Sequence, residues 1–323
     1  MKNKKLFLTA FLLVCVAATA ACFSISRDND EPSSTPRNNR TSTPKTGKQP
    51  TPDEDNKNES GKNSNEKMNG KSTSEIKDGG FAANLPAGFS QPTDPVGKKM
   101  LGEYGAMFVA KGGAAPPPKV VFNNESEVSA WQSGISKSSE NIGGATIELQ
   151  TPAMNALKEA IDEAKQNGKS ITPRGGSDAG RRDYSGTVTN WKSRVDPGLT
   201  YWVGKGRLPQ NEANRIKGLP IPEQISEIFK LESQGMYFST GKDKSIIYSV
   251  APPGTSQHIS MLALDVAQHE DSKVRAILAK HGWFQTVVSD LPHFTYLGVS
   301  ESDLPKLGLK KVSDGGRVFW IPE

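Results

Sequence analysis

Two short stretches of the chain carry most of the residue types that could do chemistry. The first, residues 253–265, contains His258 and Asp265, and the second, residues 290–294, contains Asp290 and His293. Two imidazoles and two carboxylates are what a catalytic zinc site needs: three protein ligands, a fourth position open to water, and a base beside it. The alternative is that both histidines are ordinary core or loop residues, although two of the chain's four histidines fall on these stretches.

The pattern around these residues predicts two strands that hold them. Residues 262–266 alternate between large apolar side chains and the smaller Ala263 and Asp265, which is a period of two. Asp265 should therefore point to the face opposite the leucines, and His258 should precede the strand after a Pro-Gly turn. Residues 293–297 alternate in the same way, so two adjacent strands could bring His258, Asp265 and His293 onto one ion.

The order Ser-x-His-x6-Asp, followed by Asp-x-x-His, resembles the signature of the VanY-type zinc D-alanyl-D-alanine carboxypeptidases and related peptidoglycan peptidases. The run Pro-Gly-Thr-Ser-Gln-His and the ending Ala263-x-Asp265 are close matches. Met261 departs from the glycine usual in the family, and Asp290 is the shorter of the two acids found at its position. The resemblance covers roughly residues 150–300.

This resemblance implies roles for individual residues. His258, Asp265 and His293 would bind Zn²⁺, and Asp290 would be the general base. Ser256, the serine of the motif, would hydrogen-bond substrate or groups around the metal.

In the same family a helix leads through a strand to an arginine in a Gly-Tyr-Arg-Ser-like turn, for which Arg174 is the candidate. Its guanidinium could hold a carboxylate in a bidentate fork or stabilise the oxyanion of the tetrahedral intermediate. Arg181 and Arg182 follow closely, and a surface salt-bridge arginine is the alternative interpretation of Arg174.

The fold implied by the resemblance is α+β, a small antiparallel sheet flanked by helices with the zinc site on the sheet, as in D-Ala-D-Ala metallopeptidases and hedgehog-like domains. The implied reaction is hydrolysis of an amide bond in the peptide stem of peptidoglycan, in the first place by a D-alanyl-D-alanine carboxypeptidase. An endopeptidase of the same zinc class and a non-catalytic wall-binding lipoprotein are the alternatives. The intact set of ligands and base disfavours the last.

The N-terminus predicts export to the bacterial cell envelope. Residues 1–21 combine a basic start with an apolar run too short for a secure membrane span, which is typical of a signal peptide. The run ends Thr19-Ala20-Ala21-Cys22 and resembles a bacterial lipobox, so Cys22 would be lipidated and anchor the protein facing the periplasm or wall. Ordinary cleavage after an Ala-x-Ala site is the alternative. The other cysteine, Cys15, lies within the signal, so no disulfide is expected.

The rest of the chain divides by composition. Residues 22–80 are polar and almost without apolar side chains, which predicts a disordered tether. We expect residues 81–150 to form an N-terminal part of the folded region, and 151–323 a zinc peptidase domain with an insertion at about 178–220. The net charge of +5 is modest and no aromatic-basic motif is present, so no nucleic-acid partner is expected. A monomer is expected.

Local patterns predict the secondary structure. Helices are expected over 151–168 and from Asn124 onwards, where start signals stand, over 222–234, where apolar residues have helical spacing, and over 271–280, which ends at His281-Gly282. Strands are expected over 119–122, 142–149, 245–250 and 318–321, and a further strand is expected to begin at Trp283 and Phe284 and lead to Asp290. Residues 81–118 are rich in glycine, proline and alanine, and we expect them to be loosely ordered.

Overall fold

The computed structural model describes residues 76–323. The predicted signal peptide, Cys22 and nearly all of the predicted tether therefore lie outside the described residues. In the part that is described, no helix combines the length and apolar character that crossing a bilayer requires.

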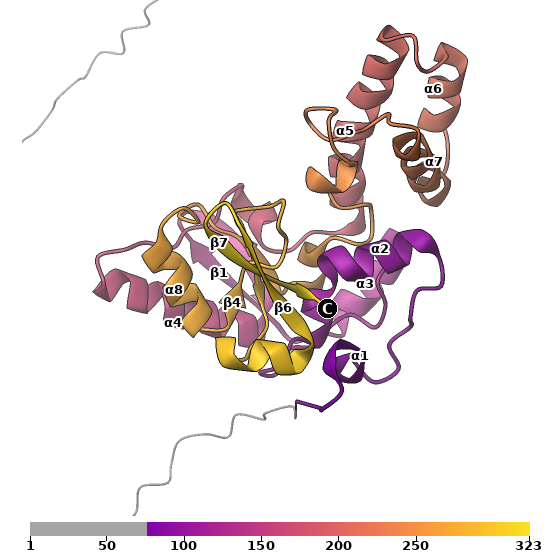
Figure 1. Cartoon of the computed structure of the whole chain (residues 1–323). Coiled ribbons are helices and arrows are strands. Elements are labelled where there is room, and N and C mark those ends of the chain that lie inside the picture. The colour runs from indigo at the N-terminus through magenta and orange to yellow at the C-terminus, as the bar shows by residue number, and fades with distance from the viewer. Residues whose placement is uncertain (1–75) are drawn as a thin grey trace, which may run out of the picture. The chain divides into compact units, whose positions relative to one another are not determined.

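The described chain combines helices with short strands (Figure 1). The α-helices are α1 (Gly80–Asn84), α2 (Pro95–Tyr104), α3 (Glu125–Ser133), α4 (Thr151–Gln166), α5 (Tyr184–Gly204), α6 (Gln210–Lys217), α7 (Ile221–Ser233) and α8 (Ser272–Lys280). The strands are β1 (Lys137–Ile142), β2 (Ala145–Gln150), β3 (Ala263–Asp265), β4 (Trp283–Phe284), β5 (His293–Tyr296), β6 (Leu309–Asp314) and β7 (Arg317–Pro322). Short 3₁₀ helices are η1 (Gly105–Val109), η2 (Gly176–Ala179), η3 (Ile246–Tyr248), η4 (Gln257–Ser260) and η5 (Glu301–Leu307).

Three small antiparallel sheets make up the β-structure of the described chain. The central sheet has the strand order β3–β5–β4, while β1 pairs with β2 and β6 pairs with β7 in separate hairpins. Helices and antiparallel sheets together confirm the α+β class.

The β1–β2 hairpin turns at two glycines. Gly143 and Gly144 have φ values of +59° and +85°, and two consecutive positive φ values are what a two-residue type I′ hairpin turn requires. This explains why a single strand predicted over 142–149 is wrong in its first half: residue 142 ends one strand, and the next begins at Ala145.

Helix α4 forms largely as its sequence predicts. Met154, Leu157 and Ala164 are fully buried on one face, Pro152 lies in the first turn, and Gly168 follows the helix with φ +65°. The cap differs from the prediction. Gln150 occupies the N-cap position, while the hydroxyl of Thr151 bonds Ser136 and Ser138 instead.

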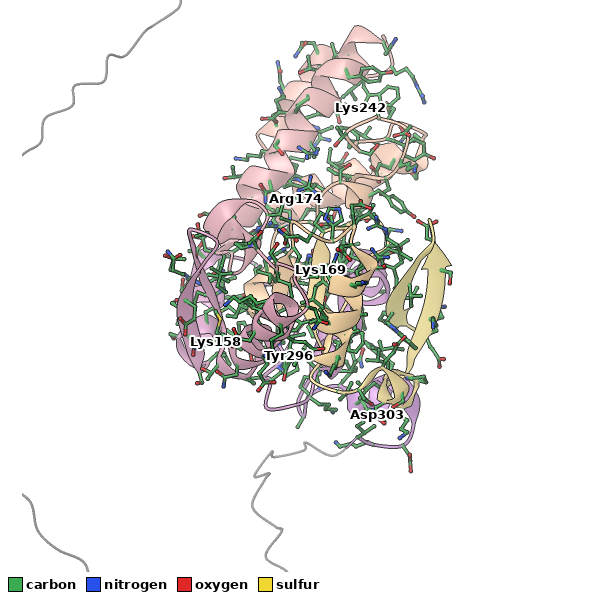
Figure 2. The ribbon with its side chains drawn as sticks, turned by 90° about the vertical axis from the view of Figure 1, so that its left-hand side faces the viewer. Lys158, Lys169, Arg174, Lys242, Tyr296 and Asp303 are labelled. Carbon is green, nitrogen blue, oxygen red and sulfur yellow. The ribbon has the colours of Figure 1, made fainter. Side chains whose placement is uncertain are left out.

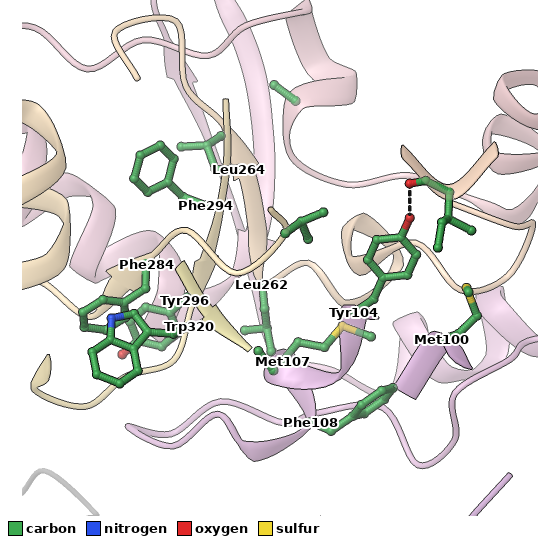
Figure 3. Packing of buried hydrophobic residues seen from close by; sticks show 14 of the residues in the cluster. Met100, Tyr104, Met107, Phe108, Leu262, Leu264, Phe284, Phe294, Tyr296 and Trp320 are labelled. Atoms are coloured by element: carbon green, nitrogen blue, oxygen red, sulfur yellow. Dashed lines mark hydrogen bonds between the residues drawn. The ribbon is translucent and has the colours of Figure 1, made fainter. Parts of the chain in front are cut away.

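The prediction that residues 81–118 are loosely ordered is wrong. Helix α2 begins after Asp94, whose side chain accepts a hydrogen bond from the Gly97 amide at 2.8 Å. The α2–η1 segment buries apolar side chains in the core, among them Met100 and Phe108 (Figure 3). From the same segment, the Tyr104 hydroxyl donates to the Ile247 carbonyl at 2.7 Å, the bond dashed in Figure 3.

Helices α5, α6 and α7 pack in sequence and build a helical group, with α5 against α6 and α6 against α7. Trp191 is buried at its centre and donates its indole N–H to Gln224 Oε1 at 2.9 Å. Core packing, rather than an exposed sugar-stacking platform, is therefore the role of this tryptophan. The helix predicted over 222–234 is confirmed as α7.

Two predicted strands are wrong. Residues 246–248 form η3, because the buried Glu232 carboxylate accepts hydrogen bonds from the Ile246 amide at 2.6 Å and the Ser245 hydroxyl at 2.5 Å. Residues 119–122 form no strand. The Phe122 amide instead bonds the Gly254 carbonyl at 3.0 Å.

Candidate metal centre

Neighbouring strands of the central sheet hold two of the predicted metal ligands. In the antiparallel pairing of β3 with β5, Asp265 lies directly opposite His293. His258 approaches from η4, which precedes β3 after a turn at Gly254. The predicted arrangement, with a histidine before one strand and a carboxylate and a histidine on two adjacent strands, is confirmed.

Ligand atoms of His258, Asp265 and His293 lie within 4.8 Å of one another. The Oδ1 atom of Asp265 is 3.4 Å from His258 Nε2 and 3.2 Å from His293 Nδ1. The two rings stand nearly perpendicular, with their centroids 4.9 Å apart. Both histidines are buried, at 2% and 3% exposure, so water does not solvate this cluster freely.

Neighbouring groups fix which nitrogen of each imidazole carries hydrogen. His258 Nδ1 lies 2.7 Å from the Gly180 carbonyl, which only accepts, so Nδ1 donates and Nε2 keeps its lone pair. His293 Nε2 lies 3.0 Å from Gln257 Oε1. The Gln257 amide nitrogen donates to the Tyr104 carbonyl at 2.9 Å, which makes Oε1 the acceptor and leaves His293 Nδ1 with the lone pair.

The resulting donor set fits a metal ion. In the neutral state both imidazole lone pairs face the same oxygen of Asp265, an arrangement that repels unless a cation lies between the three groups. Each histidine also donates its other N–H to an oxygen, as metal-binding histidines almost always do. Two nitrogens and one carboxylate oxygen are a ligand set found for catalytic zinc.

Electrostatics of the cluster favour neutral imidazole beside ionised carboxylate. Burial lowers the pKa of His258, because the charged ring would lose its hydration. Burial alone would raise the pKa of Asp265, but a proton on either imidazole supplies a charge and a hydrogen bond that outweigh burial, so that pKa is held well below its usual range and the carboxylate stays ionised. These are the protonation states in which the side chains bind metal.

A cavity of about 280 Å³ opens beside the cluster. His258 and His293 line it, together with the predicted base Asp290 and the predicted substrate-binding residue Ser256. Asp290 is exposed to solvent there, and its carbonyl accepts the His293 amide at 3.1 Å, so the turn before β5 brings acid and ligand together. The structure thus gathers five of the residues expected at the site.

Arg174 is not brought to the cavity. Its backbone amide bonds the Asp265 carbonyl at 2.8 Å, but its side chain is exposed and does not line the cavity (labelled in Figure 2). Arg182 lines the cavity instead, and its Nη2 lies 3.2 Å from Asp265 Oδ2. The turn at Gly175 and Gly176 separates Arg174 from the segment that packs on His258, so Arg182 and not Arg174 shares the cavity with the two histidines.

Of three residues that support the site, Gly180 and Gln257 were missed from the sequence, and Arg182 was named only as a neighbour of Arg174. The Gly180 carbonyl and the Arg182 amide bond His258 from both sides, at Nδ1 and at its carbonyl oxygen, and Gln257 orients His293. One signal pointed to Arg182: a glycine stands two positions before it, as in the Gly-Tyr-Arg order, whereas Arg174 follows a proline. For Gln257 the sequence held no comparable signal.

The remaining two histidines lie outside the cavity and have local structural contacts. His281 follows α8 and lies 2.8 Å from the Glu163 carboxylate through Nε2. His269 Nδ1 lies 3.0 Å from the Val266 carbonyl in the turn before α8. Neither belongs to the metal cluster.

Comparison with known proteins gives two structural similarities. A structure of the LdcB LD-carboxypeptidase, which concerns peptidoglycan recognition, aligns with a TM-score of 0.28 and 18% identity, over 49% of this chain and 64% of that one. A structure of a variant of the vancomycin-resistance D,D-pentapeptidase VanY, in complex with Zn(II), aligns with a TM-score of 0.27 and 18% identity, over 51% of this chain and 82% of that one. No family model and no curated protein matches the chain.

Proposed function

We propose that this chain is a metal-dependent peptidase that hydrolyses an amide bond in the peptide stem of bacterial peptidoglycan. One observation carries the proposal: His258 and His293 are each locked with a lone pair towards the same Asp265 oxygen, beside a cavity that also holds Asp290. The motif resemblance supplies the substrate class. D-Alanyl-D-alanine carboxypeptidase action is the form we propose first.

His258, Asp265 and His293 would hold Zn²⁺ through Nε2, a carboxylate oxygen and Nδ1. A zinc ion so bound lowers the pKa of its water to about 7 and polarises a carbonyl oxygen. The chain's task is to keep the two imidazoles neutral and oriented, which the Gly180 carbonyl and the Gln257 side chain do.

Asp290 and Arg182 would serve the reacting groups. The Asp290 carboxylate would take a proton from the attacking water and return it to the nitrogen of the leaving amine. The Arg182 guanidinium, with one nitrogen engaged by Asp265, would stabilise negative charge on the substrate oxygen through its remaining donors. Ser256, buried at the cavity wall, would hydrogen-bond the substrate.

We also propose that the chain works in the cell envelope as a monomer. The signal at 1–21, lipidation of Cys22 and the tether over 22–80 would anchor the domain at the membrane. From there the domain would reach the wall. We propose the same division of the folded region as above, into an N-terminal part over 81–150 and a zinc peptidase domain over 151–323.

The test separates metal binding from proton transfer. Metal content and hydrolysis of an acyl-D-alanyl-D-alanine peptide would be measured for the mature chain and its variants. His258→Ala should lose both metal and activity, because it removes one of three ligands. Asp290→Asn should keep about one metal per chain and lose roughly two to four orders of magnitude in turnover, the usual weight of a general base.

Asp162→Asn is the matched control, since its carboxylate lies on the exposed face of α4 against Lys165. It should change neither quantity. Full activity of Asp290→Asn would place the base elsewhere. Absence of turnover on every stem peptide by metal-loaded wild-type protein would end the proposal.

A further inference from the structure

One wall of the cavity comes from helix α5. Thr187, Asn190 and Arg194 all line the cavity, and their spacing of three and four residues places them on one face of the helix. This stripe belongs to the helical group and supplies none of the predicted metal ligands.

The N-terminal end of α5 is fixed to the metal-binding segment. The Thr187 hydroxyl donates to the Tyr184 carbonyl at 2.6 Å and accepts from the Gly254 amide at 3.3 Å. Asp183 caps the helix by accepting from the Gly186 amide at 2.7 Å. Arg194 lies seven residues beyond Thr187, about 10 Å along the helix axis at 1.5 Å per residue, so its place in the cavity is set by a rigid element.

The guanidinium of Arg194 has donors without partners. Its Nη1 donates to the Ser193 hydroxyl at 2.9 Å, while its Nε is buried and has no hydrogen-bond partner among residues 76–323. Within the same described range no carboxylate oxygen lies within 4.0 Å of it, so Asp290, the acid that shares the cavity, does not neutralise it.

Arg182 provides the contrast within the same cavity. Its Nη2 lies 3.2 Å from Asp265 Oδ2 and its Nε donates to the Asp178 carbonyl at 3.1 Å. Of the two arginines, Arg194 is therefore the one that no carboxylate of the described residues engages. A planar guanidinium with free donors matches a carboxylate, which it binds through two parallel hydrogen bonds.

We propose that Arg194 binds the free C-terminal carboxylate of the stem peptide and so selects substrates that end in a free acid. The inference rests on the proposed function and adds the specificity that it leaves open. A cavity of about 280 Å³ is at the lower end of small-ligand sites, so a carboxylate that shares it with the metal cluster must belong to a residue next to the scissile bond. In a carboxypeptidase substrate that residue is the C-terminal amino acid, which is released by the cleavage.

The test compares two peptides that differ only at the C-terminus, acyl-D-alanyl-D-alanine as free acid and as amide. The wild-type chain loaded with Zn²⁺ should prefer the acid in kcat/KM. Arg194→Gln should lose about 10- to 100-fold on the acid, the usual weight of a charge-assisted pair, and little on the amide. Arg194→Lys, which keeps the charge without the fork, should lose less. Lys192→Gln makes the same charge change at an exposed position of α5 and should leave kcat/KM unchanged for both the acid and the amide.

A binding measurement keeps this inference separate from the proposed function. Calorimetric titration of both peptides into Asp290→Asn, with and without Arg194→Gln, requires no turnover. Selective weakening of the acid by Arg194→Gln supports the inference even if no variant hydrolyses anything. Equal losses on acid and amide, or a wild-type preference for the amide or for cross-linked dimers, would overturn it.

Discussion

Gly254 offers a sharp test of how the chain positions His258, because two independent features forbid a side chain there. Its φ is +80°, a left-handed conformation that costs an alanine roughly 1–2 kcal/mol. A Cβ at this position would also lie 1.9 Å from the Phe122 carbonyl oxygen, whereas real Cβ contacts essentially never fall below 3.0 Å.

Relief of this contact requires a shift of at least 3.0 − 1.9 = 1.1 Å between the two segments. Such a shift breaks the hydrogen bond from the Phe122 amide to the Gly254 carbonyl, worth roughly 0.5–1.5 kcal/mol. The two terms together give a loss of about 1.5–3.5 kcal/mol in the free energy of unfolding for Gly254→Ala. At about 2–4 °C per kcal/mol for a domain of this size, Tm should fall by roughly 3–14 °C.

Denaturation by urea and by heat, followed by circular dichroism, would measure this loss, and a zinc titration would follow the site. Metal affinity should fall about 10- to 100-fold, because the turn at Gly254 leads directly into the His258 segment. Gly204→Ala is the control: no atom lies within 4 Å of its Cβ position at the end of α5, and the substitution should stabilise by about 0.5–1 kcal/mol. A loss below about 0.5 kcal/mol in Gly254→Ala, with unchanged metal affinity, would refute the reasoning.

Three further predictions concern the rest of the chain. Burial raises the pKa of Glu232, so the folded chain holds its proton more tightly than the unfolded chain, and its contribution to stability is lost as pH rises through the folded value. Glu232→Gln keeps the hydrogen-bonding shape, so in urea unfolding wild-type stability relative to this variant should fall as pH rises above about 4.5, the ordinary pKa of a glutamate side chain; a constant difference would contradict this. Cys22→Ala should move the mature protein from the membrane fraction to the soluble fraction, unless the wild type is already soluble and unacylated. Deletion of residues 25–75 should leave hydrolysis of small stem peptides and Tm nearly unchanged, and a marked drop in either would count against a disordered tether.

The grouping of His258, Asp265 and His293 could be predicted from the sequence because its signal is local. Period-two alternation set the face of Asp265, and the pairing of β3 with β5 then placed His293 opposite it. The supporting groups could not be predicted in this way. The side chain of Gln257 is oriented by a hydrogen bond to the Tyr104 carbonyl, and no local pattern encodes this contact across 153 positions of the chain.

The errors in the N-terminal part have a different origin. Glycine, proline and alanine dominate residues 81–118, yet Asp94 and Pro95 are a helix start signal and Met100 and Tyr104 are one turn apart. The prediction of a loosely ordered segment gave more weight to the glycine, proline and alanine content than to these helix signals. The strand expected over 245–250 failed because the buried Glu232 carboxylate, a tertiary partner, takes the Ile246 amide that a strand would need.

The hydrogen bond between Thr187 and Gly254 joins helix α5 to the segment that carries His258, and these two parts of the chain have different roles. The segments around His258 and His293 fix the ligands, whereas α5 contributes a wall of the cavity without touching them. In a peptidase of the proposed kind, substitutions at Asn190 or Arg194 would alter the accepted peptide while the reacting centre stays intact. A peptidase built in this way could diversify its substrate range through a helix that mutates independently of the chemistry, so α5 would be the element to randomise first in directed evolution.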